Sequence, residues 1–348
     1  MRIVVIRHSI RNRGGDRLVL DYCSYLVQKG HGIVYWTNEV NTHFPIDPRI
    51  QIKQIPYPQK RGTIRFALST KFDADIVLVD LVAMSVFASI PNGKKIVYLA
   101  QDDDRTYYSS PLLRFMMEII YRIAFWLFRV RAIAVSDYLK EKLERLAKGR
   151  VKSVSNGIDH RIFYHEDKSR YATEKKASIA IVLFARSDFH KGLDVGIKAV
   201  EELARLRGVK DWELWVIGDE NANINVEGLK IKKWGLLKSE ALRGVLSAAD
   251  IYLSPSRHEG FGLMQLEAMA CGCVMITTKA FSLVENELNG LVCPIEDWQS
   301  LARALNRVLS DSGLFERLRQ NGLKLAKNYS IDKSRVQFEK TLLEFVQK

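Results

Sequence analysis

Two carboxylates flank a glycine loop in the second half of the chain. Glu259 precedes the loop Gly260–Gly262, and Glu267 follows eight residues after Glu259 in an apolar stretch with helical character. Glycines let backbone N–H groups approach a ligand closely, and a helix start favours negative charge, so this loop suits a phosphate. A carboxylate accepts two hydrogen bonds at once, which suits the vicinal hydroxyls of ribose or a hexose. The alternative is a loop whose glutamates only cap the helix.

A pair of cations lies after the apolar run 179–184. Arg186 and Lys191 flank the expected strand-to-helix turn, and Gly192 opens the next helix. Two cations beside a helix start can hold a diphosphate without a metal ion. The alternative is two solvated surface cations. In the first half, Gly14 and Gly15 follow the first strand at the usual anion-loop position, although two glycines alone are a weak signal.

These residues depend on a regular series of strands and helices. Short β-branched runs alternate with helical patterns throughout the chain, which predicts βα units and parallel sheets. The expected strands are residues 3–6, 33–36, 76–79, 96–99, 132–135, 179–184, 214–217, 251–253 and 274–277. Helices are expected over 15–29 and 137–147, and again from 297 to 347.

The length of 348 residues predicts two domains. We expect an N-terminal Rossmann-like domain over residues 1–165 and a second Rossmann-like domain over 177–329. The segment 166–176 is polar and lacks an apolar period, so it is expected to be the linker. A C-terminal helix at about 330–348 is placed to pack back onto the first domain. The predicted fold class is α/β, with two doubly wound domains facing across a cleft that binds the ligand.

The composition excludes several classes of protein. A hydrophobic content of 47% with 27% charged residues is globular and excludes a disordered chain. Four cysteines exclude a disulfide scaffold and favour a reducing compartment. The first ten residues hold too short an apolar run for a signal peptide. Residues 1–176 carry 30 Lys and Arg against 18 Asp and Glu, whereas residues 177–348 are nearly balanced, so the first half is expected to face something anionic.

Taken in order, these segments resemble family 4 of the retaining, nucleotide-sugar-dependent glycosyltransferases over nearly the whole chain. Glu259 and Glu267 within EGFGLMQLEAMACG form the most specific marker of this resemblance. The weaker markers are Gly14-Gly15, Val135-Ser136 before a helix, Asn156-Gly157-Ile158-Asp159, and Arg186 with Lys191. The resemblance implies the GT-B architecture of two Rossmann-like domains, with the donor held mainly by the second. The sugar types that it suggests are those of rhamnosyl and mannosyl transferases.

The resemblance also implies roles for individual residues. Arg186 and Lys191 would stabilise the donor diphosphate as the glycosidic bond breaks, and Glu259 would contact the transferred sugar, which makes these three the expected catalytic residues. Glu267 would hold the ribose hydroxyls, and Gly15 would let the first-domain loop close over the diphosphate. The full set of expected donor-binding residues is Gly15, Arg186, Lys191, Trp234, Gly235, Leu236, Glu259, Gly260, Phe261, Gly262, Leu263 and Glu267.

One departure from the family pattern concerns the sugar. Gln101 and Asp102 stand where many members carry a His near the sugar's primary hydroxyl. A 6-deoxy sugar has no primary hydroxyl, which suits this change. Asp102–Asp104 also looks like an Asp-x-Asp metal site, but Arg186 and Lys191 make a metal unnecessary, so no metal or other cofactor is expected. His8, at the end of the first strand, is a candidate contact for the acceptor.

The stretch 112–128 is dense in large apolar residues, and its charges Arg114, Glu118 and Arg122 recur every four residues on one helical stripe. Such a helix is either packed inside the first domain or laid into a membrane interface, and we expect partial burial together with docking on an anionic membrane. The excess positive charge would also attract an acceptor bearing a polyprenyl diphosphate.

The sequence therefore predicts a retaining hexosyltransferase that uses a nucleotide-diphosphate sugar. It would move a hexosyl or 6-deoxyhexosyl unit to a glycan, either lipid-linked or a polysaccharide such as lipopolysaccharide, in surface glycan biosynthesis. The expected location is peripheral, on the cytoplasmic face of the membrane. One alternative is a transferase acting on a soluble small molecule. A basic nucleic-acid-binding α/β protein is the other, but aromatics interleaved with Lys and Arg on a strand face are not evident, so no nucleic acid partner is expected.

Overall fold

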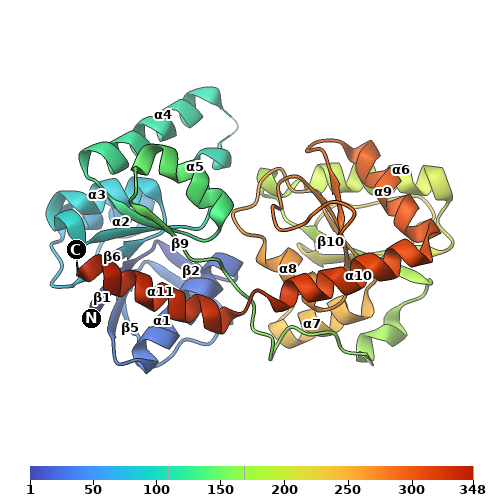
Figure 1. Ribbon diagram of the computed structural model, residues 1–348, viewed down its shortest axis with the longest axis horizontal. Helices are drawn as coiled ribbons and strands as arrows, with labels where there is room; N and C mark the ends of the chain where they lie inside the picture. The colour runs from blue at the N-terminus through green and yellow to red at the C-terminus, as the bar shows by residue number, and fades with distance from the viewer. Residues whose placement is uncertain (109, 168, 348) are drawn as a thin grey trace. The chain divides into compact units, whose positions relative to one another are not determined.

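The computed structural model describes residues 1–108, 110–167 and 169–347, which fall into two compact α/β units (Figure 1). Unit 1 contains residues Met1–Asn156 and the segment from Asp332 onward, and unit 2 contains Gly157–Ile331. The structure confirms the predicted α/β class with two doubly wound units. It also confirms the series of helices expected from residue 297 to 347.

Unit 1 is built on a parallel sheet of seven strands. Their bounds are β1 (Arg2–Ile6), β3 (Gly32–Thr37), β5 (Gln51–Gln54), β6 (Ile76–Val79), β7 (Ile96–Ala100), β8 (Arg131–Ala134) and β9 (Val151–Ser153). The order across the sheet is β5-β3-β1-β6-β7-β8-β9. Ile3 of β1 lies opposite Ile33 on one side and Ile76 on the other. A separate ladder joins β2 (Ser9–Arg11) and β4 (Glu39–Asn41).

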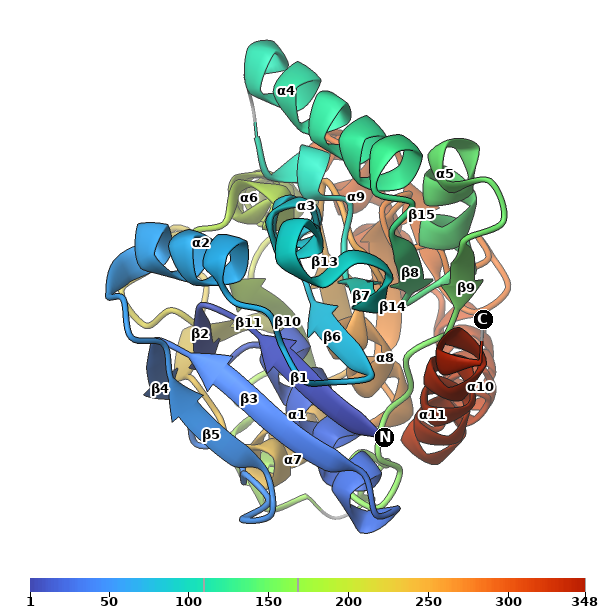
Figure 2. The ribbon, with the colours of Figure 1, turned by 90° about the vertical axis from the view of Figure 1, so that its left-hand side faces the viewer.

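Helices cover both faces of this sheet. They are α1 (Gly14–Gln28), α2 (Gln59–Ser69), α3 (Val82–Asn92), α4 (Pro111–Arg122), α5 (Asp137–Ala147) and α11 (Ile331–Val346), with short 3-10 turns at Gly93–Lys95 and Asp104–Tyr107. The chain leaves α4 through a π-helical turn, Ile123–Leu127. Figure 2 shows α2 and α3 on one side of the sheet and α1 on the other. The C-terminal helix α11 packs beside α1, where the rings of Tyr22 and Phe338 stack 4.2 Å apart.

Unit 2 repeats this plan with six parallel strands. Their bounds are β10 (Ile179–Ala185), β11 (Trp212–Gly218), β12 (Ile231–Gly235), β13 (Ile251–Ser254), β14 (Val274–Thr278) and β15 (Leu291–Cys293), in the order β12-β11-β10-β13-β14-β15. The helices are α6 (Leu193–Arg207), α7 (Ser239–Ala248), α8 (Leu263–Ala270), α9 (Trp298–Ser310) and α10 (Ser312–Lys327), with 3-10 turns at Arg170–Glu174 and Phe189–Lys191. Every residue of β11 is buried, as expected for a parallel strand covered on both faces.

Each sheet has one point where the direction of strand addition reverses. In unit 1 it lies between β1 and β6, and in unit 2 between β10 and β13. Loops that leave the carboxyl ends of such neighbouring strands diverge to opposite faces and leave room for a ligand. The functional residues are therefore best sought in the loops after β1 and β6 and after β10 and β13.

The boundary between the units differs from the one predicted from sequence. Residues 157–165 and the predicted linker 166–176 belong to unit 2. The polar side chains of this segment bond to unit 2: Ser169 Oγ donates to the Gly244 carbonyl (2.6 Å), and Lys175 pairs with Asp250 (2.8 Å). Polarity without an apolar period was therefore a poor guide to a linker, because hydrogen bonds rather than apolar contacts hold the segment in place.

Candidate active site

The loops after β10 and β13 are bound to each other at the switch point of unit 2. Gly192 has φ +65°, and a Cβ at this position would collide with the carbonyl oxygen of Pro255. The backbone N–H groups of Arg257 and His258 both donate to the carbonyl oxygen of His190, at 2.8 and 3.3 Å. Only a glycine permits this approach, so Gly192 brings together two loops that carry predicted site residues.

Lys191 and Glu259 meet across this contact. Lys191 Nζ lies 3.0 and 2.8 Å from the two carboxylate oxygens of Glu259. Ser256 Oγ and Gln265 Nε2 each donate to Glu259 Oε1 at 2.7 Å. Burial alone would raise the pKa of Glu259, but the charge of Lys191 and these hydrogen bonds hold the pKa below its ordinary value. Glu259 is thus a fixed, ionised carboxylate. The side chain of its partner Lys191 is 20% exposed.

Arg186 lies on the same loop as Lys191 but has a different partner. It pairs with Asp188, and its side chain is about a third exposed. The predicted pair of cations is therefore split between two carboxylates in the absence of a ligand. A diphosphate entering this loop would compete with Asp188 for Arg186 and with Glu259 for Lys191.

The glycine loop after Glu259 leads into α8. Gly262 has φ +86°, and a Cβ there would lie 2.6 Å from the ring of Phe281, so the tight turn requires glycine. Phe261 turns its ring inward against Tyr329 (5.8 Å between centroids), which leaves its backbone as the part able to reach a ligand. Leu263 is the first residue of α8, and Gly260 stands between Glu259 and Phe261.

Glu267 lies one turn into α8 and is 2% exposed. Both Glu267 and Glu259 lie close enough to Tyr252 to act on its hydroxyl. Burial first, and then the charges of these two carboxylates, raise the pKa of that hydroxyl well above its ordinary value. The structure thus gathers Lys191, Glu259 and Glu267 at one end of the sheet of unit 2.

The segment Trp234–Leu236 ends strand β12. The ring of Trp234 packs edge-on against Trp215 (5.2 Å) and Tyr171 (5.3 Å), so its side chain belongs to an internal aromatic cluster. Gly235 has φ +66°, with the side chain of Glu220 directly against it, and Leu236 is 67% exposed. A nucleotide base held by this segment would therefore meet Gly235 and Leu236 rather than the indole.

In unit 1, Gly15 and Gln101 lie in contact at the carboxyl end of the sheet. Gly15 belongs to the first turn of α1, and a Cβ there would collide with Gln101 Oε1. Gln101 and Asp102 directly follow β7. His8 lies elsewhere, between β1 and β2, and its Nδ1 is 3.0 Å from the Oγ1 atom of Thr63 on α2. Burial, with the nearby cations Lys60 and Arg11, lowers the pKa of His8, which favours the neutral form of its ring.

The residues Asp103 and Asp104 of the Asp-x-Asp pattern are occupied by structural contacts. Arg105 binds both oxygens of Asp103 at 2.8 and 3.0 Å. Asp104 is buried, accepts from the Val82 N–H (2.7 Å) and shares a hydrogen bond with the Tyr98 hydroxyl (3.2 Å). Within the described residues, no group of three or more His, Cys, Asp or Glu side chains is placed to hold a metal ion.

Burial raises the pKa of Asp104 to about 8, against the opposing effect of its hydrogen bond from Val82. The pKa of this carboxyl is therefore higher in the folded than in the unfolded protein. Its contribution to stability is fully present below about pH 4 and is lost as the pH rises from there through about 8. Because Asp104→Asn cannot ionise, we predict that its stability relative to the wild type rises between about pH 4 and 8 and levels off above about pH 8. Urea unfolding at both pH values measures this, and parallel pH profiles would contradict it.

Two residues of these networks, Ser256 and Gln265, were not assigned a site role from sequence, whereas Arg7 was a candidate acceptor contact together with His8. Ser256 and Gln265 orient Glu259, and Arg7 binds the Gly15 carbonyl oxygen (3.2 Å) and the carboxylates of Asp16 and Asp80. Gln265 stands three residues after Gly262, the N-cap of α8. From this position a Gln side chain commonly reaches back past the helix start, so the spacing could have identified Gln265 as a site residue. Nothing in the sequence pairs Arg7 with Asp80, because that contact follows from the register of β1 with β6.

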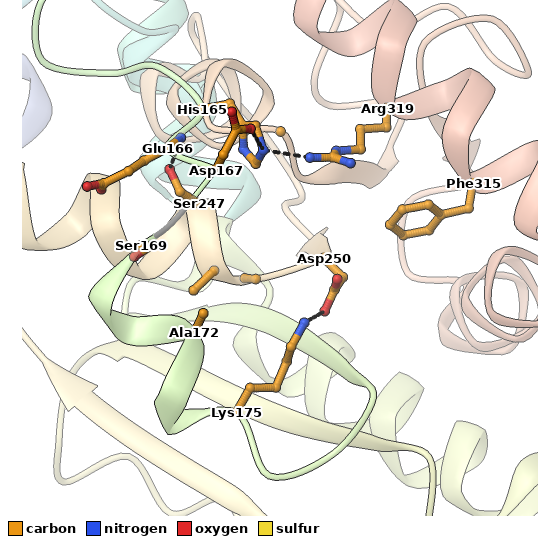
Figure 3. Close-up of a pocket in the computed structure, with 13 residues that line it drawn as sticks. His165, Glu166, Asp167, Ser169, Ala172, Lys175, Ser247, Asp250, Phe315 and Arg319 are labelled. Carbon is orange, nitrogen blue, oxygen red and sulfur yellow. Dashed lines mark hydrogen bonds and ion pairs between the residues drawn. The ribbon is translucent and has the colours of Figure 1, made fainter.

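A cavity of about 240 Å³ lies at the other end of the unit 2 sheet (Figure 3). Asp250 and Lys175, which precede β13 and β10, pair with each other in its wall. Arg319 lies 2.7 Å from the ring nitrogen Nε2 of His165 on the opposite wall. The charged groups of this cavity are thus largely paired among themselves, and it is lined by none of the predicted donor-binding residues.

Sequence comparison finds a family match within unit 2. Residues 178–311 match the family described as "Glycosyl transferases group 1". An uncharacterized glycosyltransferase of Methanocaldococcus jannaschii is 24% identical over 213 residues, which is 58% of this chain and 56% of that protein. The lipopolysaccharide core biosynthesis glycosyltransferase LpsE of Rhizobium meliloti is 28% identical over 165 residues, or 45% of this chain and 46% of LpsE. The chain spans about half the length of the curated relatives it matches.

Structural comparison extends the likeness to both units. HepE from Anabaena, solved in complex with UDP-glucose, aligns with a TM-score of 0.75 at 18% identity, covering 99% of this chain and 100% of HepE. Other glycosyltransferases align equally completely. At such low identity the alignment establishes the fold, and the residues of the site are assigned from the chain itself. The chain therefore has the GT-B fold, and the segment that carries Lys191, Glu259 and Glu267 is similar to the group 1 glycosyl transferases.

Proposed function

We propose that the chain is a retaining glycosyltransferase that transfers a hexosyl or 6-deoxyhexosyl unit from a nucleotide-diphosphate sugar. The observation that carries the proposal is the Lys191–Glu259 pair at the switch point of unit 2, beside the glycine loop and the start of α8. A cation, a fixed carboxylate and a helix start at one place can bind a phosphate and a sugar hydroxyl together. The match of residues 178–311 to the group 1 glycosyl transferases and the UDP-glucose bound by HepE support a nucleotide-sugar donor.

The donor would bind by exchanging the partners of the two cations. Its diphosphate takes Lys191 from Glu259 and Arg186 from Asp188, which neutralises the phosphate charge without a metal ion. Glu259, released from Lys191 but still held by Ser256 and Gln265, then accepts hydrogen bonds from the sugar. Glu267 would hold the ribose hydroxyls, with Gly235 and Leu236 beside the base. Gly15 would close over the diphosphate.

Catalysis in this proposal rests on charge stabilisation and positioning. As the glycosidic bond breaks, negative charge grows on the departing phosphate oxygen, where Lys191 and Arg186 stabilise it. That oxygen takes the proton of the acceptor hydroxyl, which attacks from the same face of the sugar, so the anomeric configuration is retained. The chain needs no separate nucleophile for this reaction, and the acceptor must be held close and correctly oriented.

The acceptor would be lipid-linked or a polysaccharide in surface glycan biosynthesis, with the protein on the cytoplasmic face of the membrane. The role of LpsE in lipopolysaccharide core biosynthesis and the excess positive charge of the first half support this choice. Gln101 and Asp102 would face the C6 position of the transferred sugar, where an amide and a carboxylate replace a histidine. His8 would meet the acceptor from the neighbouring loop.

Thermal-shift measurements with UDP, GDP, dTDP and their sugars, with and without EDTA, test the donor site. Ligand bound to the folded state raises the Tm. We predict a shift with one base that survives EDTA and is lost in Glu267→Ala, whereas the exposed control Glu201→Ala on α6 keeps it. A shift that requires a divalent ion would overturn metal-free binding. The absence of a shift with every nucleotide, in folded protein, would overturn the donor site.

A further inference from the structure

Helix α4 and the π-helical turn after it are apolar on two opposite sides. One side faces unit 1 and buries Met117, Tyr121 and Phe125. The other side faces solvent, and its large apolar side chains are between 42% and 72% exposed. We call these residues the outer ridge: Leu112, Phe115, Met116, Ile119, Trp126 and Leu127. A surface helix of a soluble domain normally turns polar residues to water, so this second apolar side requires an explanation.

The outer ridge lies along the outer edge of unit 1. In both Figure 1 and Figure 2, α4 is the outermost helix above the sheet, and no other element of unit 1 covers its outer side. The ridge is a single helix, and its side chains recur at 112, 115, 116 and 119, which are successive turns of one face. Its shape is therefore a narrow apolar strip rather than a groove.

The charges around the ridge are cationic. Arg114, Arg122 and Arg129 are exposed along it. The one acidic residue of this helix, Glu118, is bound by Arg105 (2.6 Å) and Arg122 (3.1 Å). The Arg122 guanidinium lies 5.3 Å from the centre of the Trp126 ring. Arginine and tryptophan beside exposed leucine and phenylalanine are the residue types that bind the boundary between lipid headgroups and acyl chains.

We propose that the outer ridge inserts into the headgroup region of an anionic lipid bilayer, with α4 parallel to the membrane surface. The arginines would pair with lipid phosphates, while the apolar tips would enter the acyl boundary to a depth of about 5–10 Å. Across residues 1–108, 110–167 and 169–347, no helix has the length and apolar content to span a bilayer. This docking goes beyond the proposed transfer reaction and does not depend on which donor is used.

Co-sedimentation of the full chain with vesicles tests the proposal. We predict binding to vesicles of phosphatidylcholine with phosphatidylglycerol, and much weaker binding to phosphatidylcholine alone. Phe115→Ser/Leu127→Ser removes two apolar tips and should lower the partition coefficient roughly tenfold or more. Val336→Ser/Leu343→Ser on α11 of the same unit also changes two exposed apolar residues and should leave it unchanged. Equal loss in both double variants, or no binding by the wild type at low salt, would overturn the proposal.

A second measurement separates a lipid surface from a protein partner. Light scattering gives the mass of the wild type and of the Phe115→Ser/Leu127→Ser variant, with circular dichroism to show that both are folded. If the ridge instead joins two copies of the chain, the wild type will be a dimer and the variant a monomer, and this result would contradict membrane docking.

A third pair of substitutions tests the charges. Arg114→Gln/Arg122→Gln should weaken binding to anionic vesicles while leaving the mass unchanged. Added salt should weaken vesicle binding by the wild type in the same way. If the double arginine variant loses affinity but added salt does not weaken binding by the wild type, the role of these charges is contradicted.

Discussion

Lys191→Ala is expected to lower kcat for glycosyl transfer by about 10²- to 10³-fold, the cost of removing one group that stabilises developing charge. The charge in question is that of the departing nucleoside diphosphate, and Arg186 would be the remaining cation in the loop. Because the loss acts on the transition state, we expect kcat to fall more than KM rises. Release of nucleoside diphosphate from the donor identified by thermal shift gives both constants.

The variant has a second effect that must be separated from the first. Without Lys191, the buried carboxylate of Glu259 loses its cation, and breaking such a pair costs about 3–5 kcal/mol of stability. Adding Glu259→Gln removes the stranded charge, so the double variant should regain much of the lost Tm yet remain inactive. Lys198→Ala, which removes an exposed cation from the following helix, serves as the control. Recovery of activity together with Tm in the double variant would show that Lys191 is structural.

Several of the strands that were predicted from sequence are buried on both faces. The runs at 76–79 and 251–253 are continuous apolar segments, and both appear as β6 and β13, the latter one residue longer. The strand at Gln51–Gln54 was missed because it is the edge strand of its sheet and all four residues are exposed. An edge strand is specified by its backbone pairing with β3 rather than by an apolar pattern, so composition carries little signal there.

The candidate site shows a similar limit. The family resemblance, rather than spacing, placed Lys191 and Glu259 in one ligand site. It could not indicate that they bind each other, because that contact depends on the register of β10 with β13 and on the close approach at Gly192. The resemblance placed Trp234 beside the base, and the structure shows its partly buried ring packed against Trp215. Side-chain direction at a strand end is decided by packing that the sequence does not display.

The two switch points use charge differently, and the cation of unit 1 leads to a second large stability effect. In unit 1, Arg7 Nη2 lies 2.8 Å from Asp16 and 2.7 Å from Asp80, so one guanidinium ties the loop after β1 to the end of β6. All three side chains are less than 20% exposed. Burial alone would lower the pKa of Arg7, but Asp80, Tyr35 and Asp16 hold it above its ordinary value. This cation is therefore saturated by protein groups, whereas Lys191 has a single carboxylate that a ligand can replace.

Arg7→Met keeps most of the apolar volume but leaves Asp16 and Asp80 without their cation, and should lower the free energy of unfolding by about 3–5 kcal/mol. Burial already raises the pKa of Asp16 against the effect of Arg7, so loss of Arg7 should raise it further. A carboxyl with a raised folded pKa destabilises the protein progressively as pH rises, so the deficit should shrink at acidic pH. Urea unfolding as a function of pH measures both effects.

Arg2→Ala serves as the control. Arg2 begins strand β1, and its pair with Asp73 is largely exposed, so this change should cost under about 1 kcal/mol. Asp16→Asn and Asp80→Asn added to Arg7→Met should restore most of the loss, because no buried charge then remains unpaired. A deficit that is independent of pH and unrelieved by these two changes would instead assign the role of Arg7 to packing.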